Sequence, residues 1–309
     1  MLCGRRWVID GGLGSALQCN GFDISSDPLW SARILVSNPD AIKEVHKSYL
    51  EAGAEILITS SYQTSVQGFR KHMGVEEEAA IEFMKQSVHL ANEAVEEYYK
   101  KYRGVKPLVA GSIGPYGACQ ADGSEYDGKY ASHMTTEELM EWHKPRIAAL
   151  TETGVNFLAV ETIPSLKEAL AVIKVLRTFP VIKAWVSFSC KDGHHTNYGD
   201  KFRESVKRCY EEGGNQLIAL GTNCTPPQHI SSLLQQANIA LPPASVLPRV
   251  IYPNSGEKWI AGKGWEGRST NWPYVSEISK WMSLGASVIG GCCRLGPCDI
   301  KNIAQVVMT

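Results

Sequence analysis

The sequence predicts an α/β protein and, within that class, a single-domain (β/α)8 barrel. Eight short apolar segments alternate with eight helical segments along 309 residues, and this alternation indicates parallel strands joined by helical crossovers. Eight strand–helix pairs at this length are typical of one closed barrel. Cysteines follow the sixth and eighth predicted strands, and a metal ion shared by them requires those strand ends to lie close together. An open doubly wound sheet is the alternative.

The predicted strands are apolar segments that stop at glycine or at a polar residue. The first begins at Trp7 and stops at Asp10-Gly11-Gly12. Such short apolar runs, bounded by glycine or polar residues, are typical of buried strands in a parallel sheet. The predicted strands cover residues 7–10, 54–59, 107–113, 155–160, 183–188, 216–221, 245–252 and 287–291.

The predicted helices follow each strand, and several begin at clear start signals. Asn38 and Pro39 combine a side-chain cap with a proline in the first turn. Thr135 or Thr136 can cap another helix. We expect a long loop over 23–38, with a helical turn near Trp30. The predicted helices cover residues 39–53, 76–102, 135–152, 165–177, 202–212, 226–240, 272–284 and 297–307.

The composition is that of an ordinary globular protein with a sizeable core. Hydrophobic residues make up 44% and charged residues 20%, and the formal net charge is −1. Nucleic acid is not expected as the main partner, because no basic excess exists to neutralise phosphates. No apolar run reaches the length of a membrane span, and no signal peptide is recognised. Nine cysteines without disulfide-scaffold spacing predict a reducing, cytoplasmic environment.

Three cysteines lie where two predicted strands end. Cys224 follows the strand at 216–221, and Cys292 and Cys293 follow two glycines at 290–291. Glycine tolerates dihedral angles that other residues avoid, so the backbone can bend there and turn both adjacent thiols toward one ion. Three thiolates with an open fourth position are typical of a catalytic Zn²⁺. The alternatives are small buried side chains and a vicinal disulfide between Cys292 and Cys293.

Further polar and aromatic residues stand at other predicted strand ends. Asp10 and Glu161 place two carboxylates at the mouth where barrel enzymes perform chemistry. They can act as general acid and base or bind a substrate ammonium group, whereas a turn former and an internal salt bridge are the structural alternatives. Trp30, Tyr62 and Tyr116 can line a pocket for a cation, although each can also serve packing alone.

Five motifs, taken together, resemble the homocysteine S-methyltransferase family. The resemblance extends from about Ile9 to the last predicted helix and is specific, because the motifs follow successive strands in order. It implies a zinc-bearing (β/α)8 barrel that methylates the thiol of homocysteine to form methionine. The motifs are Asp10-Gly11-Gly12, Glu161-Thr162, Asn223-Cys224, Tyr252-Pro253-Asn254-Ser255-Gly256 and Gly290-Gly291-Cys292-Cys293-Arg294.

The resemblance also implies roles for individual residues. Zn²⁺ would be held by Cys224, Cys292 and Cys293, which thereby activate the substrate thiol. Homocysteine would be held through its amino and carboxyl groups by Asp10, the backbone of Gly11, and Glu161. We expect further substrate contacts from Trp30, Tyr62 and Asn223, and methyl-donor contacts from Tyr116 and Asn254.

The methyl donor is expected to be a sulfonium compound. The segments 111–117 and 122–126 resemble the short family members that use S-methylmethionine or S-adenosylmethionine. The chain lacks the C-terminal extension by which betaine-dependent members assemble, so we expect a monomer. Cys298 stands at the start of the last predicted helix, where no metal ligand is expected.

The sequence is also compatible with three other functions. A barrel could keep the three thiols and bind zinc without catalysing any reaction. The acceptor could be a related thiol or a selenol instead of homocysteine. An aldolase-type barrel enzyme is disfavoured, because Lys183 begins its strand and so lies at the wrong end for a Schiff base.

Overall fold

Eight parallel strands form one sheet in the order β1-β10-β7-β6-β5-β4-β3-β2. The computed structural model describes residues 2–260, 264–266 and 274–309, with side chains outside 258–275. Ile9 bridges Ile56 in parallel, and the Asp10 N–H donates to the Ile56 carbonyl at 3.1 Å, which closes the sheet. The predicted (β/α)8 barrel is therefore confirmed over the open alternative. The strands are β1 (Trp7–Val8), β2 (Ile56–Ile58), β3 (Leu108–Ile113), β4 (Phe157–Ile163), β5 (Ala184–Phe188), β6 (Leu217–Asn223), β7 (Arg249–Tyr252) and β10 (Ala286–Ile289).

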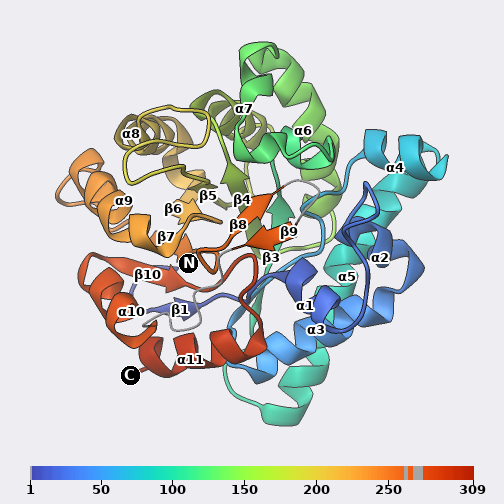
Figure 1. The fold of residues 1–309 in the computed structure, drawn as a ribbon, viewed down its shortest axis with the longest axis horizontal. Coiled ribbons are helices and arrows are strands. Elements are labelled where there is room, and N and C mark those ends of the chain that lie inside the picture. The colour runs from blue at the N-terminus through green and yellow to red at the C-terminus, as the bar shows by residue number, and fades with distance from the viewer. Residues whose placement is uncertain (1, 261–263, 267–273) are drawn as a thin grey trace.

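Helices surround the strands as an outer ring (Figure 1). All eight predicted helices are present, and the one expected from residue 272 begins at Tyr274 in the described chain, residue 272 itself lying outside it. Thr135 caps the helix at 136 with a capping box, as its sequence signal predicts. These helices are α3 (Pro39–Glu51), α5 (Glu77–Tyr102), α6 (Thr136–Thr151), α7 (Leu166–Leu176), α8 (Phe202–Gly213), α9 (Pro227–Ala240), α10 (Tyr274–Ser283) and α11 (Pro297–Val307).

Three short helices occur where none was predicted. The expected loop at 23–38 contains α2 (Ser31–Ser37), so that prediction was wrong in part, and α1 (Leu13–Cys19) follows the first strand. Neither helix has a side-chain cap, and each buries only two to four residues, so their sequence signal is weak. The third, α4 (Val66–Met73), has a Ser65 cap and ends at Gly74 in the left-handed region.

The strand bounds differ from the predicted ones by a few residues, most at β4 and β7. β4 continues to Ile163 instead of stopping before Glu161, because its register with β5 shifts between Val160 and Ile163. Thr162 has a φ of +59° at this bulge. β7 begins at Arg249 rather than 245, since Pro248 has no N–H to donate to a neighbouring strand. A small antiparallel hairpin of β8 (Lys258–Ile260) and β9 (Gly264–Glu266) follows β7 and was not predicted.

The barrel interior is filled by large side chains beneath the mouth. Trp185 is completely buried, and its indole N–H donates to the Tyr252 hydroxyl at 3.1 Å. The Phe157 and Trp185 rings lie 5.3 Å apart, so the centre of the barrel is a packed core rather than a channel. The interior cluster contains Leu2, Trp7, Ile9, Ile56, Ala110, Phe157, Ala159, Trp185, Ala219, Val250, Tyr252 and Val288.

Gly221 permits the close approach of β6 to β7. A Cβ atom at this position would lie 1.8 Å from the Val250 carbonyl oxygen, closer than any real contact. Because Cys224 follows β6 and the Cys292 N–H bonds the residue after β7, the spacing of these two strands also positions the thiols.

We therefore predict that Gly221→Ala strongly destabilises the barrel. The added methyl forces β6 and β7 apart, and the free energy of unfolding should fall by about 3 kcal/mol or more, measured by denaturant titration. Gly296→Ala is the control, because a Cβ there meets nothing within 4 Å, and it should cost less than about 1 kcal/mol. Equal stability of the two variants would contradict this account.

Candidate functional site

Cys224, Cys292 and Cys293 meet at the carboxyl end of the barrel. Their sulfur atoms all lie within 4.8 Å of one another, and the Cys224 and Cys293 sulfurs are 3.5 Å apart. Both cysteine segments are attached to the end of β7. The Cys224 N–H donates to the Tyr252 carbonyl at 3.0 Å, and the Cys292 N–H donates to the Pro253 carbonyl at 2.8 Å.

The bends that gather the thiols lie at other residues than predicted. Gly290 and Gly291 do not adopt a left-handed φ, whereas Cys224 has a φ of +47° and Arg294 one of +68°. The glycines are required for space instead. A Cβ at Gly290 would lie 2.7 Å from the Ile9 carbonyl oxygen, and one at Gly291 would lie 2.8 Å from the Leu295 side chain.

The sulfur cluster has the dimensions of a metal site. A tetrahedral zinc with Zn–S bonds of about 2.3 Å places its sulfur ligands about 3.8 Å apart, which is compatible with the observed spacing. Hydrogen bonds from Cys224 and Cys292 hold the pKa of Cys293 well below its usual value. All nine cysteines are free, and Cys298 is exposed and stands outside the cluster. The three residues therefore fit a thiolate-bound metal, and no disulfide joins them.

Asp10 and Glu161 are both buried beside this cluster. Asp10 Oδ2 accepts the Ile58 N–H at 2.8 Å, but Oδ1 is buried without a hydrogen-bond partner among the described residues. Burial raises the pKa of Asp10, and the nearby Glu161 raises it further. Burial likewise raises the pKa of Glu161 to about 7, although hydrogen bonds from Ser112 and Tyr252 oppose this. Buried carboxylate oxygens are normally hydrogen-bonded, so Asp10 Oδ1 can accept a hydrogen bond from a ligand.

A cavity of about 160 Å³ opens in front of the three thiols. Of the predicted site residues, seven line it and four do not. The lining includes Glu125, Tyr126 and Tyr252, to which the sequence analysis assigned no role. The seven are Gly11, Trp30, Tyr62, Glu161, Cys224, Cys292 and Cys293, and the four outside are Asp10, Tyr116, Asn223 and Asn254.

Three of these four residues make hydrogen bonds that fix the backbone around the site. Asn223 is fully buried, and its Oδ1 accepts the Thr162 N–H at 2.7 Å, which supports the strained bulge beside Glu161. Asn254 donates to the Cys224 carbonyl at 3.3 Å. The Tyr116 N–H donates to Glu168 at 2.7 Å. These contacts place them behind the cavity surface.

The cavity lining carries acidic side chains and no basic ones in the described part of the chain. Within the described part of the chain, the lining contains Glu125 and Glu161 and no Lys, Arg or His. Burial raises the pKa of Glu125 to about 7. Trp30, Tyr62 and Tyr126 add aromatic rings to the same lining. Acidic and aromatic groups without basic partners favour cationic ligands.

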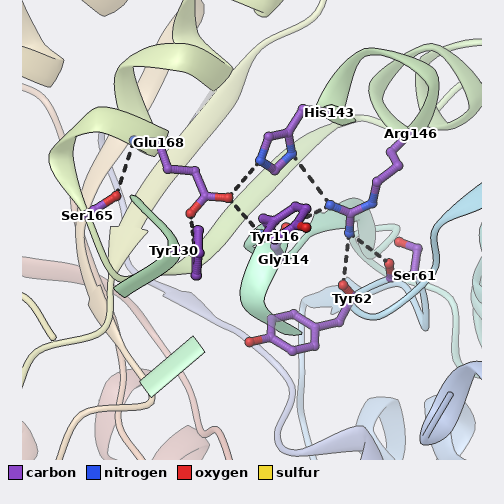
Figure 2. A network of polar contacts seen from close by, with 9 residues as sticks. All are labelled: Ser61, Tyr62, Gly114, Tyr116, Tyr130, His143, Arg146, Ser165 and Glu168. Carbon is purple, nitrogen blue, oxygen red and sulfur yellow. Dashed lines mark hydrogen bonds and ion pairs between the residues drawn. The ribbon is translucent and has the colours of Figure 1, made fainter. Parts of the chain in front are cut away.

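A buried polar network, which was not predicted from the sequence, joins α6 and α7 to the loops after β2 and β3 (Figure 2). Glu168 Oε1 accepts the Tyr116 N–H at 2.7 Å and lies 3.0 Å from His143 Nε2. Its Oε2 accepts the Tyr130 hydroxyl at 2.5 Å. Glu168 thereby holds both ends of the segment 116–130, which carries Glu125 and Tyr126.

Arg146 completes this network from helix α6 (Figure 2). It is almost fully buried and donates to the Gly114 carbonyl at 2.7 Å and the Tyr62 carbonyl at 2.9 Å. A second Nη1 contact joins it to His143 Nδ1 at 3.5 Å. The loops after β2 and β3 are thus tied to one guanidinium group.

The chain belongs to the homocysteine S-methyltransferase family. Its sequence matches that family over residues 7–307, and none of the described helices is long and apolar enough to cross a membrane. The predicted enzyme class is therefore confirmed.

Several relatives are named for homocysteine as the acceptor, and one of these names also states betaine as the donor. The chain is 42% identical over 302 residues to homocysteine S-methyltransferase YbgG of Bacillus subtilis, covering 96% of this chain and 93% of the relative. It is 39% identical to betaine-homocysteine S-methyltransferase of Drosophila melanogaster, covering 96% and 92%. The metallated homocysteine methyltransferase MmuM of Escherichia coli superposes with a TM-score of 0.85 at 36% identity, covering 98% and 96%.

We predict that Arg146→Met destabilises the protein by about 3–5 kcal/mol, because it leaves the buried carbonyls of Gly114 and Tyr62 without their donor and removes a buried positive charge that interacts with Glu168. Denaturant unfolding measures the change. Arg177→Met is the matched control, since Arg177 pairs with Glu212 at the surface, and it should cost about 0.5 kcal/mol. Similar losses in both variants would show that the buried network contributes no special stability.

Proposed function

We propose that this protein transfers a methyl group from a sulfonium donor to the thiol of homocysteine, at a Zn²⁺ held by Cys224, Cys292 and Cys293. The observation that carries the proposal is a three-sulfur cluster opening on a cavity with acidic and aromatic walls and no basic side chain in the described lining. Homocysteine as acceptor agrees with the family to which the chain belongs.

The three thiols supply ligands for all but one position of a tetrahedral zinc. A bound Zn²⁺ would keep the homocysteine thiol deprotonated at neutral pH, where a free thiol with a pKa of about 8.5 is mostly protonated. Cys224, Cys292 and Cys293 would hold the Zn²⁺ beside the cavity, where the homocysteine sulfur can reach it. The three cysteinates leave the site negatively charged, which keeps the substrate sulfur nucleophilic.

Asp10, Gly11 and Glu161 would orient homocysteine by its polar end. The unpartnered Oδ1 of Asp10 and the buried carboxyl of Glu161 suit an ammonium group, which brings three N–H donors. A Cβ at Gly11 would collide with the Leu295 carbonyl at 2.4 Å, so only glycine fits there. Proton transfer by these acids is not required, because the thiol is already deprotonated when it attacks.

A positively charged donor accounts for the aromatic residues of the cavity lining. The thiolate forms a new S–C bond to the methyl group, while the old C–S bond breaks and leaves its electron pair on the donor sulfur. That sulfonium becomes a neutral thioether, so opposite charges disappear together. Trp30, Tyr62 and Tyr126 can stabilise the cation by their ring faces and exclude water. S-methylmethionine and S-adenosylmethionine both meet this requirement.

The direct test is methionine formation from homocysteine with S-methylmethionine, S-adenosylmethionine and betaine in parallel, with and without a zinc chelator. We expect turnover with at least one sulfonium donor and its loss on chelation, restored by Zn²⁺. Turnover with betaine alone would contradict the sulfonium proposal. Zinc-loaded protein without turnover on any donor would favour a silent zinc-binding barrel, and turnover only with a selenol would change the acceptor.

Alanine at Cys224, Cys292 or Cys293 should remove both zinc and activity, because each supplies one of three thiolates. Zinc content is measured by mass spectrometry of the metal after dialysis. Cys209→Ala is the matched control, since Cys209 is a buried thiol outside the cluster, and it should keep one zinc per chain. The ligand assignment fails if all three cluster variants also keep zinc.

Glu161→Gln should raise the KM for homocysteine about 10- to 100-fold, the loss expected for one charge-assisted hydrogen bond. Zinc content and the donor KM should stay unchanged, because Glu161 is assigned to the ammonium group of homocysteine. Steady-state kinetics at saturating donor measure the effect. Loss of zinc instead would place Glu161 among the metal ligands.

A further inference from the structure

We propose that Glu125 binds the α-ammonium group of the methyl donor and so makes the enzyme select donors that carry an amino group. This inference rests on the proposed function, since it assumes a sulfonium donor in the same cavity. Donor specificity is thereby assigned to a carboxylate in segment 122–126, for which no individual role was predicted from the sequence.

Glu125 presents an unused hydrogen-bond acceptor at the cavity. It lies in a 3-10 turn, Ser124–Tyr126, between β3 and α6, and it lines the cavity together with Tyr62 and Tyr126. Its Oε2 atom is buried and has no hydrogen-bond partner in the described chain. A buried carboxylate oxygen without a donor costs stability, so a ligand N–H at this position offsets that cost.

Glu125 is separate from the two carboxylates assigned to homocysteine. Asp10 and Glu161 lie close enough for the charge of Glu161 to raise the pKa of Asp10. Glu125 is carried by a different element, the turn Ser124–Tyr126 between β3 and α6, whereas Asp10 follows β1 and Glu161 lies in β4.

The chemistry of the donor identifies which of its groups Glu125 binds. A sulfonium sulfur carries positive charge but no N–H, so it is stabilised by the aromatic rings and cannot satisfy a carboxylate oxygen. An α-ammonium group carries three N–H donors. S-methylmethionine and S-adenosylmethionine have such a group, whereas sulfonium acids without the amino group do not.

The turn that carries Glu125 is held in place from both sides. A Cβ at Gly117 would lie 2.6 Å from the Glu125 backbone nitrogen, so the preceding turn packs directly against it. Glu168 holds the Tyr116 N–H and the Tyr130 hydroxyl, which flank the segment (Figure 2). A carboxylate held in one position can discriminate between donors, because it cannot shift to contact a donor that lacks the amino group.

The test compares S-methylmethionine with 4-(dimethylsulfonio)butanoate, which is the same molecule without the α-amino group. Isotope-labelled homocysteine makes the labelled methionine report acceptor methylation alone. Wild type, Glu125→Gln and Asp122→Asn are assayed for kcat/KM with each donor. Asp122 is the control because it is an exposed acid of the same turn, outside the cavity lining, and its asparagine can still accept the Ser124 N–H.

We expect wild type to prefer S-methylmethionine by about 10-fold or more, the size of one charge-assisted hydrogen bond. Glu125→Gln should abolish most of that preference through the donor KM, with zinc content and the homocysteine KM unchanged. Asp122→Asn should keep the preference within about 2-fold. An unchanged preference in Glu125→Gln, or an equal loss in Asp122→Asn, would overturn the inference.

Two further outcomes distinguish the role of Glu125 from the methyl transfer itself. A wild-type enzyme that uses both donors equally overturns the role of Glu125 and leaves the methyl transfer standing, even if Glu125→Gln does not fold. A wild-type enzyme that uses neither these donors nor S-adenosylmethionine overturns the proposed function itself.

Discussion

The site depends on the close approach of the carboxyl ends of β6, β7 and β10. Backbone hydrogen bonds from Cys224 to Tyr252, the last residue of β7, and from Cys292 to Pro253 just after it hold the two cysteine segments side by side. Gly221 lets β6 approach β7, and Gly290 lets the end of β10 approach Ile9. Barrel closure thus brings three thiols that are up to 69 residues apart in sequence into one cluster. The proposed metal binding and methyl transfer both depend on that cluster.

The charge distribution then defines what the cluster can work on. Three thiols, two lining glutamates and the buried Asp10 make this end of the barrel acidic, and no basic side chain is found in the described cavity lining. Such a site concentrates cations and strengthens its interactions with them where water is excluded. Homocysteine, through its ammonium group, and a sulfonium donor both bring the positive charge that the walls lack.

Much of the fold was predictable because it depends on local patterns. The alternation of apolar segments and capped helices predicted all eight barrel strands, and strand-end cysteines predicted the cluster. α1 and α2 were missed because each is only seven residues long and has no side-chain cap. The bulge at Thr162 was missed because a register shift depends on the neighbouring strand. His143 and Arg146 lie on α6 and Glu168 lies on α7, and only the tertiary fold brings the two helices together.

The central claim is that three cysteine sulfurs hold zinc and leave one position for the substrate sulfur. X-ray absorption at the zinc edge, on zinc-loaded protein with and without homocysteine, tests this directly by counting sulfur ligands. We expect three sulfurs and one oxygen or nitrogen at the zinc without homocysteine, and four sulfurs with it. A sulfur count that stays the same when saturating homocysteine is added, or a shell with fewer than three sulfurs, would contradict it.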